Sequence, residues 1–542
     1  MKSEEISNFC IGKGILIDKG LLTIFNDAND FESVKLIIER IKEQTGQRFI
    51  TKTFFENEKV AKKFLSSFPQ ENQTIKKLKI QLGLSIEISN ENTRENIEIS
   101  ELDKEKMKID DKVKVYPFFS PHNKKIEVDD FTNYFKNRVI EMKKFLQDKN
   151  ELENLVSISK LSGMRQAASI IGLVYGKNIT KNGNIILEVE DITGRLKVLI
   201  NKNKEDTYSK AEDISLDSVI GFKGFSNKEI FFANDVIFPD ASLPIRKKSP
   251  IDESVVFISD VHVGSRLFLE KNLLKFIDYL NLETPEFEEA KKIKYLFIVG
   301  DLVAGVGVYP NQEKELAIVD LKRQYEKAAE LLGKIRKDIK IIIIPGNHDC
   351  VRLMEPQPIL DEKYAKPLYE MENVIHASNP SLINIGERGD FPGFNILTYH
   401  GFSYPYYVNT IPSLMTRGSP LNPEKIMAYL LKNRHLGPTH NTFVQTLPFT
   451  DNDLIIKVVP DIFVSGHTHK GGVLYYKNIL LLSTTCWEEL MPYQEKMGFE
   501  SDYCKVPMFN LKTGQVKILD FYDEEDSLKK KENKKDVLEI YN

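Results

Sequence analysis

Six short apolar segments in the second half of the chain have the pattern of buried strands. They lie at residues 255–258, 295–299, 341–344, 394–399, 462–466 and 479–485. Each is rich in β-branched, aliphatic or aromatic residues and has the length of a strand rather than of a helix. Strands with this continuous apolar character are typical of sheets that are covered on both faces. The pattern therefore predicts an α/β domain, which we place at residues 251–522.

A second group of strands is predicted between residues 168 and 240. Its five members lie at residues 169–175, 184–191, 194–200, 219–225 and 229–237. The sequence Asp191-Ile-Thr-Gly194 provides the turn between the second and third of them. Five strands with such a turn resemble an oligonucleotide/oligosaccharide-binding (OB) barrel.

Two interpretations of this barrel remain open. In the first, it binds nucleic acid through cations that follow the phosphates and aromatic rings that stack on bases. The candidates are Lys177, Lys181, Arg195, Lys197 and Lys202 for the phosphates, and Tyr175 or Phe222 for the bases. In the second interpretation, the barrel only packs against its neighbouring domain.

The remaining parts of the chain are divided by composition. Residues 1–69 alternate strand-like and helical patterns and predict a small α+β or helical N-terminal domain. Residues 70–125 are rich in Glu, Lys, Asn and Asp, which predicts a charged linker that is either disordered or in part a solvated helix. Apolar residues at helical spacing over 131–155 predict an amphipathic helix, which we group with the barrel as residues 126–250. Residues 523–542 form a charged C-terminal tail.

The amino-acid composition and charge of the chain exclude only a few classes of protein. The chain has 542 residues and a formal net charge of −4, so binding to DNA would depend on local basic patches. The four cysteines are spaced too widely for a zinc knuckle or a disulfide scaffold. Because the N-terminus lacks the apolar core of a signal peptide and no apolar run reaches membrane-spanning length, we expect a cytoplasmic protein.

Polar side chains of types that can bind metals follow five of the six apolar segments of residues 251–522. They are Asp260, His262, Asp301, Asn347, His348, Asp349, His400, His467 and His469, whereas the segment at 479–485 leads to no ligand. Because open α/β sheets place their sites at the carboxyl ends of strands, we expect these loops to converge. Mixed imidazoles and carboxylates suit two divalent cations, with Mn²⁺ preferred and Fe, Zn or Mg as alternatives.

These motifs resemble those of the calcineurin-like metallophosphoesterase superfamily. The matching segments are Asp260-x-His262, Gly300-Asp301, Gly346-Asn-His-Asp349, His400-Gly401 and Gly466-His-Thr-His469. The resemblance implies a β-sandwich flanked by helices. It implies that one metal is held by Asp260, His262, Asp301 and His469, and the other by Asp301, Asn347, His400 and His467.

The resemblance also implies a mechanism. A water molecule activated at the metals would attack a phosphodiester in line. His348 would donate a proton to the leaving 3′-oxygen, and Asp349 would orient His348.

A narrower resemblance extends over about residues 126–522. The segments that carry it are Val156-Ser-Ile-Ser159, Asp191-Ile-Thr-Gly194, Ile258-Ser-Asp-Val-His-Val-Gly-Ser265 and Arg434-His-Leu-Gly-Pro438. They are similar to the small subunits of archaeal D-family DNA polymerases. That family implies a 3′–5′ exonuclease that proofreads within a heterodimer. The partner would be the large catalytic subunit, and the substrate single-stranded DNA or a primer 3′ end.

Two alternatives to this function come from other classes. The chain could be a non-catalytic structural subunit, or a stand-alone metallophosphoesterase or repair nuclease. A further partner is suggested by the tail, where Leu538 and Tyr541 have the spacing of a sliding-clamp-binding peptide. A solvated tail end is the competing interpretation.

Overall fold

The protein consists of two compact units, Met1–Ile99 and Ser100–Asn542. This computed structural model describes residues 3–18, scattered positions up to residue 50, 109–110, 113–117, 125–161, 166–226, 230–415, 422–440, 444–448, 454–490 and 500–523. In the first unit, helix α1 (Ser3–Gly12) precedes strand β1 (Leu16–Ile17), which pairs in parallel with β2 (Phe49–Ile50). Most of the predicted linker, and the tail peptide with its clamp-binding pattern, lie outside the described residues.

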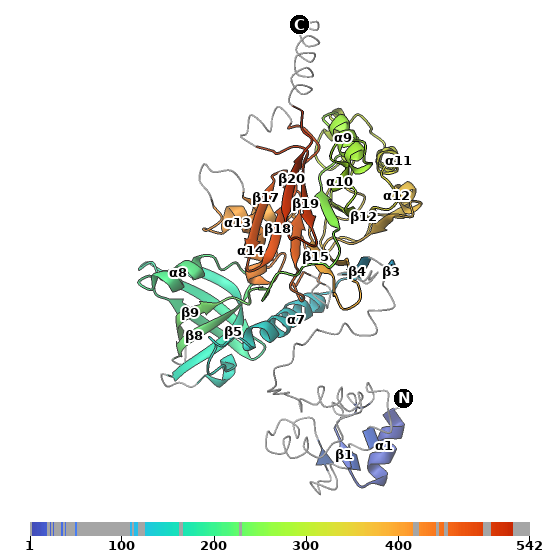
Figure 1. The fold of residues 1–542 in the computed structure, drawn as a ribbon. Coiled ribbons are helices and arrows are strands. Elements are labelled where there is room, and N and C mark those ends of the chain that lie inside the picture. The colour runs from blue at the N-terminus through green and yellow to red at the C-terminus, as the bar shows by residue number, and fades with distance from the viewer. Residues whose placement is uncertain are drawn as a thin grey trace. The chain divides into compact units, whose positions relative to one another are not determined.

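The largest part of the second unit contains two sheets (Figure 1). The six-stranded sheet has the order β13-β12-β11-β10-β19-β20. Its strands are β10 (Ser254–Ile258), β11 (Ile293–Val299), β12 (Lys340–Ile344), β13 (Val374–His376), β19 (Lys505–Asn510) and β20 (Val516–Asp520). The first four of these run parallel, while β19 and β20 close one edge as an antiparallel pair.

The seven-stranded sheet has the order β17-β18-β16-β15-β14-β4-β3. Its strands are β3 (Ile109–Asp110), β4 (Val113–Pro117), β14 (Ser381–Ile385), β15 (Phe394–Thr398), β16 (Ile462–Ser465), β17 (Gly472–Tyr476) and β18 (Ile479–Ser483). The central strands β15, β16 and β18 are parallel. All six apolar segments predicted to be strands are therefore strands, three in each sheet.

Alternating side chains bury both faces of each sheet. On β10, Val255 and Phe257 lie in a core between the two sheets, where they meet residues such as Ile396 and Val464. Val256 and Ile258 point the other way. Helices α9 (Glu270–Leu280), α11 (Leu321–Leu332) and α12 (Glu362–Tyr369) cover that outer face, and α13 (Tyr404–Thr410) and α14 (Pro423–Asn433) cover the other sheet. The predicted β-sandwich flanked by helices is confirmed.

The five strands predicted between residues 168 and 240 form a closed barrel. They are β5 (Gln166–Ile179), β6 (Ile185–Asp191), β7 (Gly194–Ile200), β8 (Val219–Ser226) and β9 (Ile230–Ile237), in the order β5-β6-β7-β9-β8. The predicted turn is built by Asp191, whose Oδ1 accepts hydrogen bonds from the backbone of Thr193 at 2.7 Å and of Gly194 at 2.9 Å. This local side-chain bond is the reason that aspartate begins such turns.

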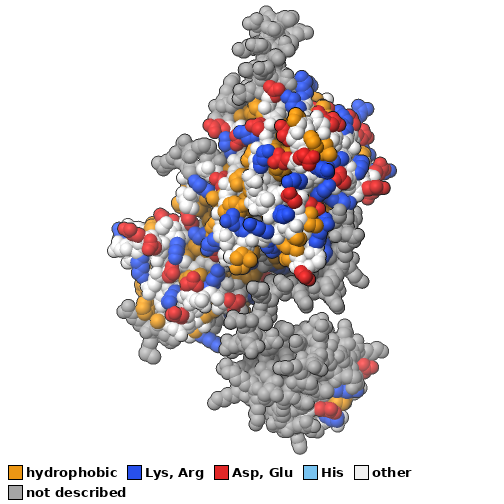
Figure 2. All heavy atoms as spheres, in the orientation of Figure 1, with side chains coloured by type: hydrophobic (Ala, Val, Ile, Leu, Met, Phe, Trp, Pro, Cys, Tyr) orange, Lys and Arg blue, Asp and Glu red, His pale blue; other side chains and the backbone are white. Residues whose placement is uncertain are grey.

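Two of the barrel residues predicted to contact nucleic acid are not available for it. Phe222 is completely buried in the barrel core, so the prediction that it stacks on a base is wrong. Lys177 donates its Nζ to the carbonyl oxygens of Glu212 and Ile214, where it caps the end of α8 (Glu205–Glu212), so its prediction as a phosphate contact is also wrong. On the face drawn in Figure 2, charges of both signs are interspersed over the described surface.

The amphipathic helix predicted before the barrel is α7 (Val128–Gln147), which ends earlier than the expected residue 155. Beyond it the chain turns to pair Leu155 with Ser169 of the barrel. The helix joins the barrel to the sandwich through Arg138, whose buried guanidinium donates to the carbonyl oxygens of Asp217 and Pro438. Among the described residues, no helix has both the length and the apolar character needed to cross a membrane.

One part of the predicted linker is ordered in the sandwich. Strand β4 pairs antiparallel with β14, with Val113 opposite Ile385 and Val115 opposite Ile383. Val113 is completely buried in the core between the sheets. This short apolar stretch is surrounded by charged residues. Sequence analysis did not identify it as a strand, because five residues are too few to show a clear alternation of apolar and polar side chains.

The buried position of Val113 can be tested by truncating its side chain. We expect Val113→Ala to lower the free energy of unfolding by about 2 kcal/mol, because it removes two methyl groups from a closed core. The matched control is Val128→Ala, since the Val128 side chain is 82% exposed. Chemical denaturation of both variants measures the difference; equal stability would contradict the assignment of β4 to the sheet.

Candidate metal centre

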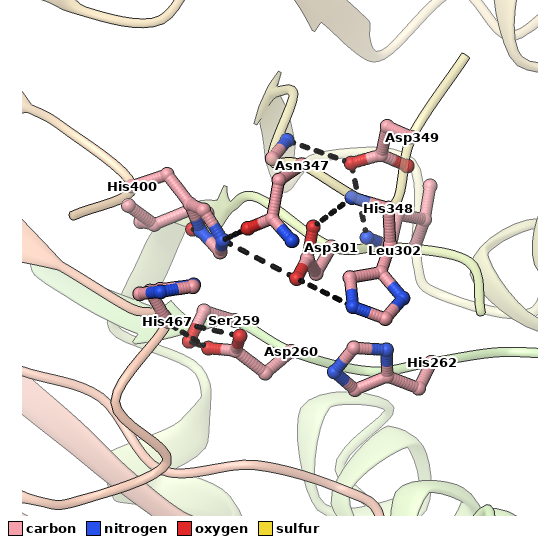
Figure 3. A network of polar contacts seen from close by, with 12 residues as sticks. Ser259, Asp260, His262, Asp301, Leu302, Asn347, His348, Asp349, His400 and His467 are labelled. Atoms are coloured by element: carbon pink, nitrogen blue, oxygen red, sulfur yellow. Dashed lines mark hydrogen bonds and ion pairs between the residues drawn. The ribbon is translucent and has the colours of Figure 1, made fainter. Parts of the chain in front are cut away.

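The carboxyl ends of five strands bring the predicted site residues together. They come from the loops after β10, β11, β12, β15 and β16, so both sheets contribute. The assembled residues are Asp260, His262, Asp301, Asn347, His348, Asp349, His400, His467 and His469. Figure 3 shows Asp301 and Asp260 with their neighbours His262, Asn347, His348, Asp349, His400 and His467. The expected convergence of the loops is confirmed by this geometry.

The first cluster of possible ligands consists of Asp260, His262 and His469. Their ligand atoms all lie within 4.8 Å of one another. The Nε2 atoms of His262 and His469 are 3.2 Å apart, and Nε2 of His469 is 3.4 Å from Oδ1 of Asp260. Three buried or half-buried donors that face one point in this way can hold a divalent cation.

The second cluster consists of Asp301, His400 and His467, with Asn347 beside it. Nε2 of His400 lies 3.3 Å from Oδ2 of Asp301 and 3.1 Å from Oδ1 of Asn347. The other nitrogen of His400, Nδ1, donates to the carbonyl oxygen of Val299 at 2.9 Å. Because that bond fixes the ring, Nε2 is aimed at the cluster.

Asp301 also belongs to a third cluster, with His262 and His348. His262 is itself a member of the first cluster. Asp301 therefore lies where a carboxylate can bridge two cations, which matches the predicted bridging position. The calcineurin-like fold implies divalent metal ions, and two carboxylates, an amide and several inward-facing imidazoles form a donor set that fits them.

The backbone at this site adopts a conformation that side-chain-bearing residues usually avoid. Left-handed φ angles occur at Asp260 (50°), His262 (52°), Asp301 (51°), His467 (69°) and His469 (54°). Each such residue costs about 1–3 kcal/mol and persists only where its surroundings enforce the conformation. Five of the predicted ligands have such a conformation. These loops therefore accept an unfavourable backbone conformation that places the ligand side chains in the site.

Three glycines allow the loops to approach each other. A Cβ atom on Gly300 would lie 2.2 Å from Nδ1 of His400, and one on Gly346 would lie 2.2 Å from Oδ1 of Asp301. A Cβ on Gly466 would lie 2.6 Å from Oδ2 of Asp260. All three distances are shorter than atoms can tolerate, so any side chain there would displace a site residue.

The pKa values of Asp301 and its neighbouring histidines are shifted by burial and by their mutual contacts. Burial alone would raise the pKa of Asp301, but the neighbouring His400 and His348 lower it well below its usual range. Burial would lower the pKa of His400, yet its contact with Asp301 raises it to about 9. Burial and the proximity of His400 lower the pKa of His467 to about 3. The site thus stabilises ionised carboxylates next to at least one neutral imidazole, as cation binding requires.

Asp349 does not orient His348 as predicted. Its Oδ2 accepts from the backbone N–H groups of Gly346 at 2.9 Å and Leu302 at 3.3 Å, and its Oδ1 accepts from the hydroxyl of Tyr325 at 3.0 Å. That prediction is wrong because the carboxylate is used to tie two loops together.

His348 is positioned by a different group. Its Nδ1 donates to the carbonyl oxygen of Ala304 at 2.8 Å, and its backbone N–H donates to Oδ1 of Asp301 at 2.8 Å. The remaining nitrogen, Nε2, lies 4.0 Å from Oδ2 of Asp301, on the side of the site. His348 therefore presents one free ring nitrogen to whatever occupies the centre.

Two site neighbours escaped sequence analysis. Asn379, in the loop before β14, accepts the backbone N–H of His400 on its Oδ1 at 2.9 Å. Glu488, in the loop after β18, places Oε2 3.9 Å from Nε2 of His262. Neither residue belongs to a sequence motif of metal ligands. Glu488 does follow the apolar segment 479–485, for which no ligand was predicted. Its position after a parallel strand was the available signal.

Comparison with known proteins agrees with the geometry. The family model for calcineurin-like phosphoesterases matches residues 254–471. The DNA polymerase II small subunit of Methanothermobacter thermautotrophicus is 36% identical over 398 residues, which are 73% of this chain and 80% of that protein. The subunit of the same name from Pyrococcus abyssi is 40% identical over 405 residues, but the chain spans only 64% of its length.

Solved structures resemble the chain only in part. An archaeal phosphodiesterase is 11% identical and covers 49% of this chain and 98% of its own, with a TM-score of 0.25. Vps29 from Entamoeba histolytica, complexed with zinc, is 15% identical and covers 50% of this chain and 99% of its own, with a TM-score of 0.22.

The close approach of Gly346 to Asp301 can be tested with a single methyl group. We expect Gly346→Ala to lower the affinity for Mn²⁺ by about tenfold or more, because Asp301 must move out of position. Gly437→Ala is the matched control, since a Cβ there meets only Leu454 at an ordinary 3.7 Å. Isothermal titration of the metal-free proteins measures the effect, and equal affinities would contradict the proposed packing.

Proposed function

The chain belongs to the family of DNA polymerase II small subunits, and on this basis we propose that it carries a metal-dependent 3′–5′ exonuclease within a heterodimeric DNA polymerase. In this proposal it proofreads newly made DNA and acts as a scaffold for the large catalytic subunit. The single observation that carries the enzymatic part is the convergence of the predicted ligand residues on one centre.

Two divalent ions, with Mn²⁺ preferred, are proposed for this centre. Asp260, His262 and His469 would hold one and Asn347, His400 and His467 the other, with Asp301 shared between them. Bound there, the ions would lower the pKa of a water molecule and neutralise charge on a phosphodiester. The chain's own contribution is to fix the donors, through bonds such as that from Nδ1 of His400 to Val299.

His348 is proposed to move the proton. Its Nδ1–H is committed to the carbonyl oxygen of Ala304, so the doubly protonated ring would give its Nε2 proton to the leaving 3′-oxygen and become the neutral Nδ1–H form. Asp349 is proposed to act one step further away, by holding the backbone of Gly346 and Leu302 in place. In this proposal His348 transfers the proton, and Asp349 maintains the conformation of the loop.

The barrel is proposed to be an OB domain. Its strand order of first, second, third, fifth and fourth, and its helix between the third and fourth strands, support that assignment. Contact with single-stranded DNA would use the exposed Lys181, Lys197 and Lys202, together with Tyr175. The guanidinium carbon of Arg195 lies 5.2 Å from the centre of the Tyr175 ring. The alternative of a purely structural barrel is supported by the buried Arg138 junction.

The enzymatic proposal is tested on end-labelled single-stranded DNA with Mn²⁺. We expect the intact protein to shorten the strand from its 3′ end. Asp301→Asn should remove both activity and metal, because it breaks both proposed sites. His348→Asn should slow cleavage by about 10²–10⁴-fold while metal content stays at the level of the unchanged protein.

The control for these variants is Asp390→Asn, since Asp390 is exposed. Full cleavage by His348→Asn would reject the proton-transfer role alone. Metal binding without any cleavage in the unchanged protein would instead favour the non-catalytic structural subunit.

The partner proposals need separate measurements. We expect the chain to co-purify with a large catalytic subunit from its native cell, and isolation of the chain alone would count against the heterodimer. Clamp binding remains a prediction for the tail. Deletion of residues 535–542 should abolish binding to a sliding clamp in a pull-down, and unchanged binding would reject the role of Leu538 and Tyr541.

A further inference from the structure

A cavity of about 290 Å³ lies at the end of the sandwich opposite to the metal centre. Its wall includes Phe394 and Ile462, the first residues of β15 and β16, whereas proposed metal ligands follow the carboxyl ends of the same two strands. Residues 246–248 of the segment between the barrel and the sandwich also line it. Its volume is close to the lower limit of sites for small ligands, about 300 Å³.

The inner wall of the cavity is apolar and comes from both sheets. Leu480 of β18 joins Phe394 and Ile462 from one sheet, and Phe509 of β19 comes from the other. None of these four residues is more than 5% exposed. The rings of Phe394 and Phe509 pack edge to face, with centroids 5.7 Å apart. Such a wall suits a flat apolar group better than a hydrated ion.

One carboxylate oxygen is buried at this cavity without a hydrogen-bond donor. Asp461 lines the cavity and is 7% exposed. Its Oδ2 accepts from Nζ of Lys247 and from the backbone N–H of Asn395, each at 2.8 Å. Its Oδ1 accepts from no group of the described residues. A buried acceptor left in this state costs free energy, and a ligand with an N–H donor would remove that cost.

The mouth of the cavity is cationic. Among the described residues that line it, Asp461 is the only acidic one and is paired with Lys247, which leaves the exposed Arg246 and Lys248 with two positive charges. The guanidinium carbon of Arg246 lies 4.4 Å from the centre of the Tyr475 ring. Because a ring contact uses the face of the guanidinium, its N–H edges suit a phosphate group.

We propose that this cavity binds a nucleoside monophosphate, with its base against the apolar wall and its phosphate at Arg246 and Lys248. An amino group on the base, such as that of adenine, would donate to Oδ1 of Asp461. Inorganic phosphate would leave the apolar wall and Asp461 unused, and an uncharged apolar molecule would leave the cations unused. The inference goes beyond the proposed function, because this site requires neither metal nor cleavage.

The test is calorimetric titration of the full chain, freed of metal, with deoxyadenosine monophosphate. We expect this nucleotide to bind at least about tenfold more tightly than the analogue that lacks the amino group of adenine, because only the amino group gives Oδ1 of Asp461 a donor. Inorganic phosphate should bind more weakly still. Equal affinities of the nucleotide and the analogue would overturn the inference, since solvent would then satisfy Asp461 equally well.

Two other results of the titration would also overturn the inference. If inorganic phosphate bound as tightly as the nucleotide, the cavity would hold an adventitious ion only. If the nucleotide did not bind, the cavity would be no nucleotide site. Hydrogen exchange then locates the bound nucleotide: we expect slower amide exchange at residues 245–249. Protection confined to other segments would overturn the assignment to this cavity.

Substitutions test the separate contacts. Arg246→Ala should weaken binding of the nucleotide by about tenfold, because it removes a charged partner of the phosphate. Lys291→Ala is the matched control, since Lys291 is exposed and does not line the cavity. Asp461→Asn should bind the nucleotide and the analogue equally, because the amide can present a donor in place of the acceptor.

The two variants carry different risks for folding. If Asp461→Asn loses its thermal unfolding transition, Arg246→Ala still tests the inference, because the side chain of Arg246 is exposed. Unchanged nucleotide binding by Arg246→Ala would overturn the inference. A folded Asp461→Asn that kept the preference for the amino group would do the same.

Discussion

The geometry of the metal centre depends on backbone hydrogen bonds that join the loop after β10 to the loop after β11. The backbone N–H groups of Asp260 and Val261 donate to the carbonyl oxygens of Gly300 and Asp301 at 3.0 and 2.9 Å. His262 also donates to the carbonyl oxygen of Asp301, at 3.2 Å. These bonds hold left-handed residues that would otherwise relax, since an isolated chain would avoid such φ angles. The strain is therefore sustained by the same contacts that align the ligands.

The complete site also requires that the two sheets end at the same place. The loops after β10, β11 and β12 come from one sheet and those after β15 and β16 from the other, and the apolar core between the sheets fixes their separation. The glycines at the strand ends then let the loops approach to contact distance. Gly300 lies against His400 and Gly466 against Asp260, so each contact joins one sheet to the other. Burial of the sandwich supplies the free energy that keeps the strained loops together.

Sequence alone could predict the strands and the convergence of the candidate ligand residues, because both follow from strong local patterns. It failed where tertiary contacts decide a side chain's role. Asp349 follows His348 directly, yet it binds backbone N–H groups, and Phe222 turned out to face the barrel core. Val113 has an apolar neighbourhood too short to show a period, and its burial depends on β14, far along the chain. Glu488 reaches the site from a loop that no spacing rule connects with His262.

The pKa values of two neighbouring histidines in the centre are shifted in opposite directions. His400 is driven toward the charged form by Asp301, while His467, in ring contact with it at 5.1 Å between centroids, is driven toward the neutral form. Two imidazoles so close cannot both carry a proton without strong repulsion. A dication would satisfy the same carboxylate and leave both rings neutral, with lone pairs directed inward. A cation bound beside Asp301 would displace the proton that Asp301 favours on His400, so metal binding would be linked to proton release.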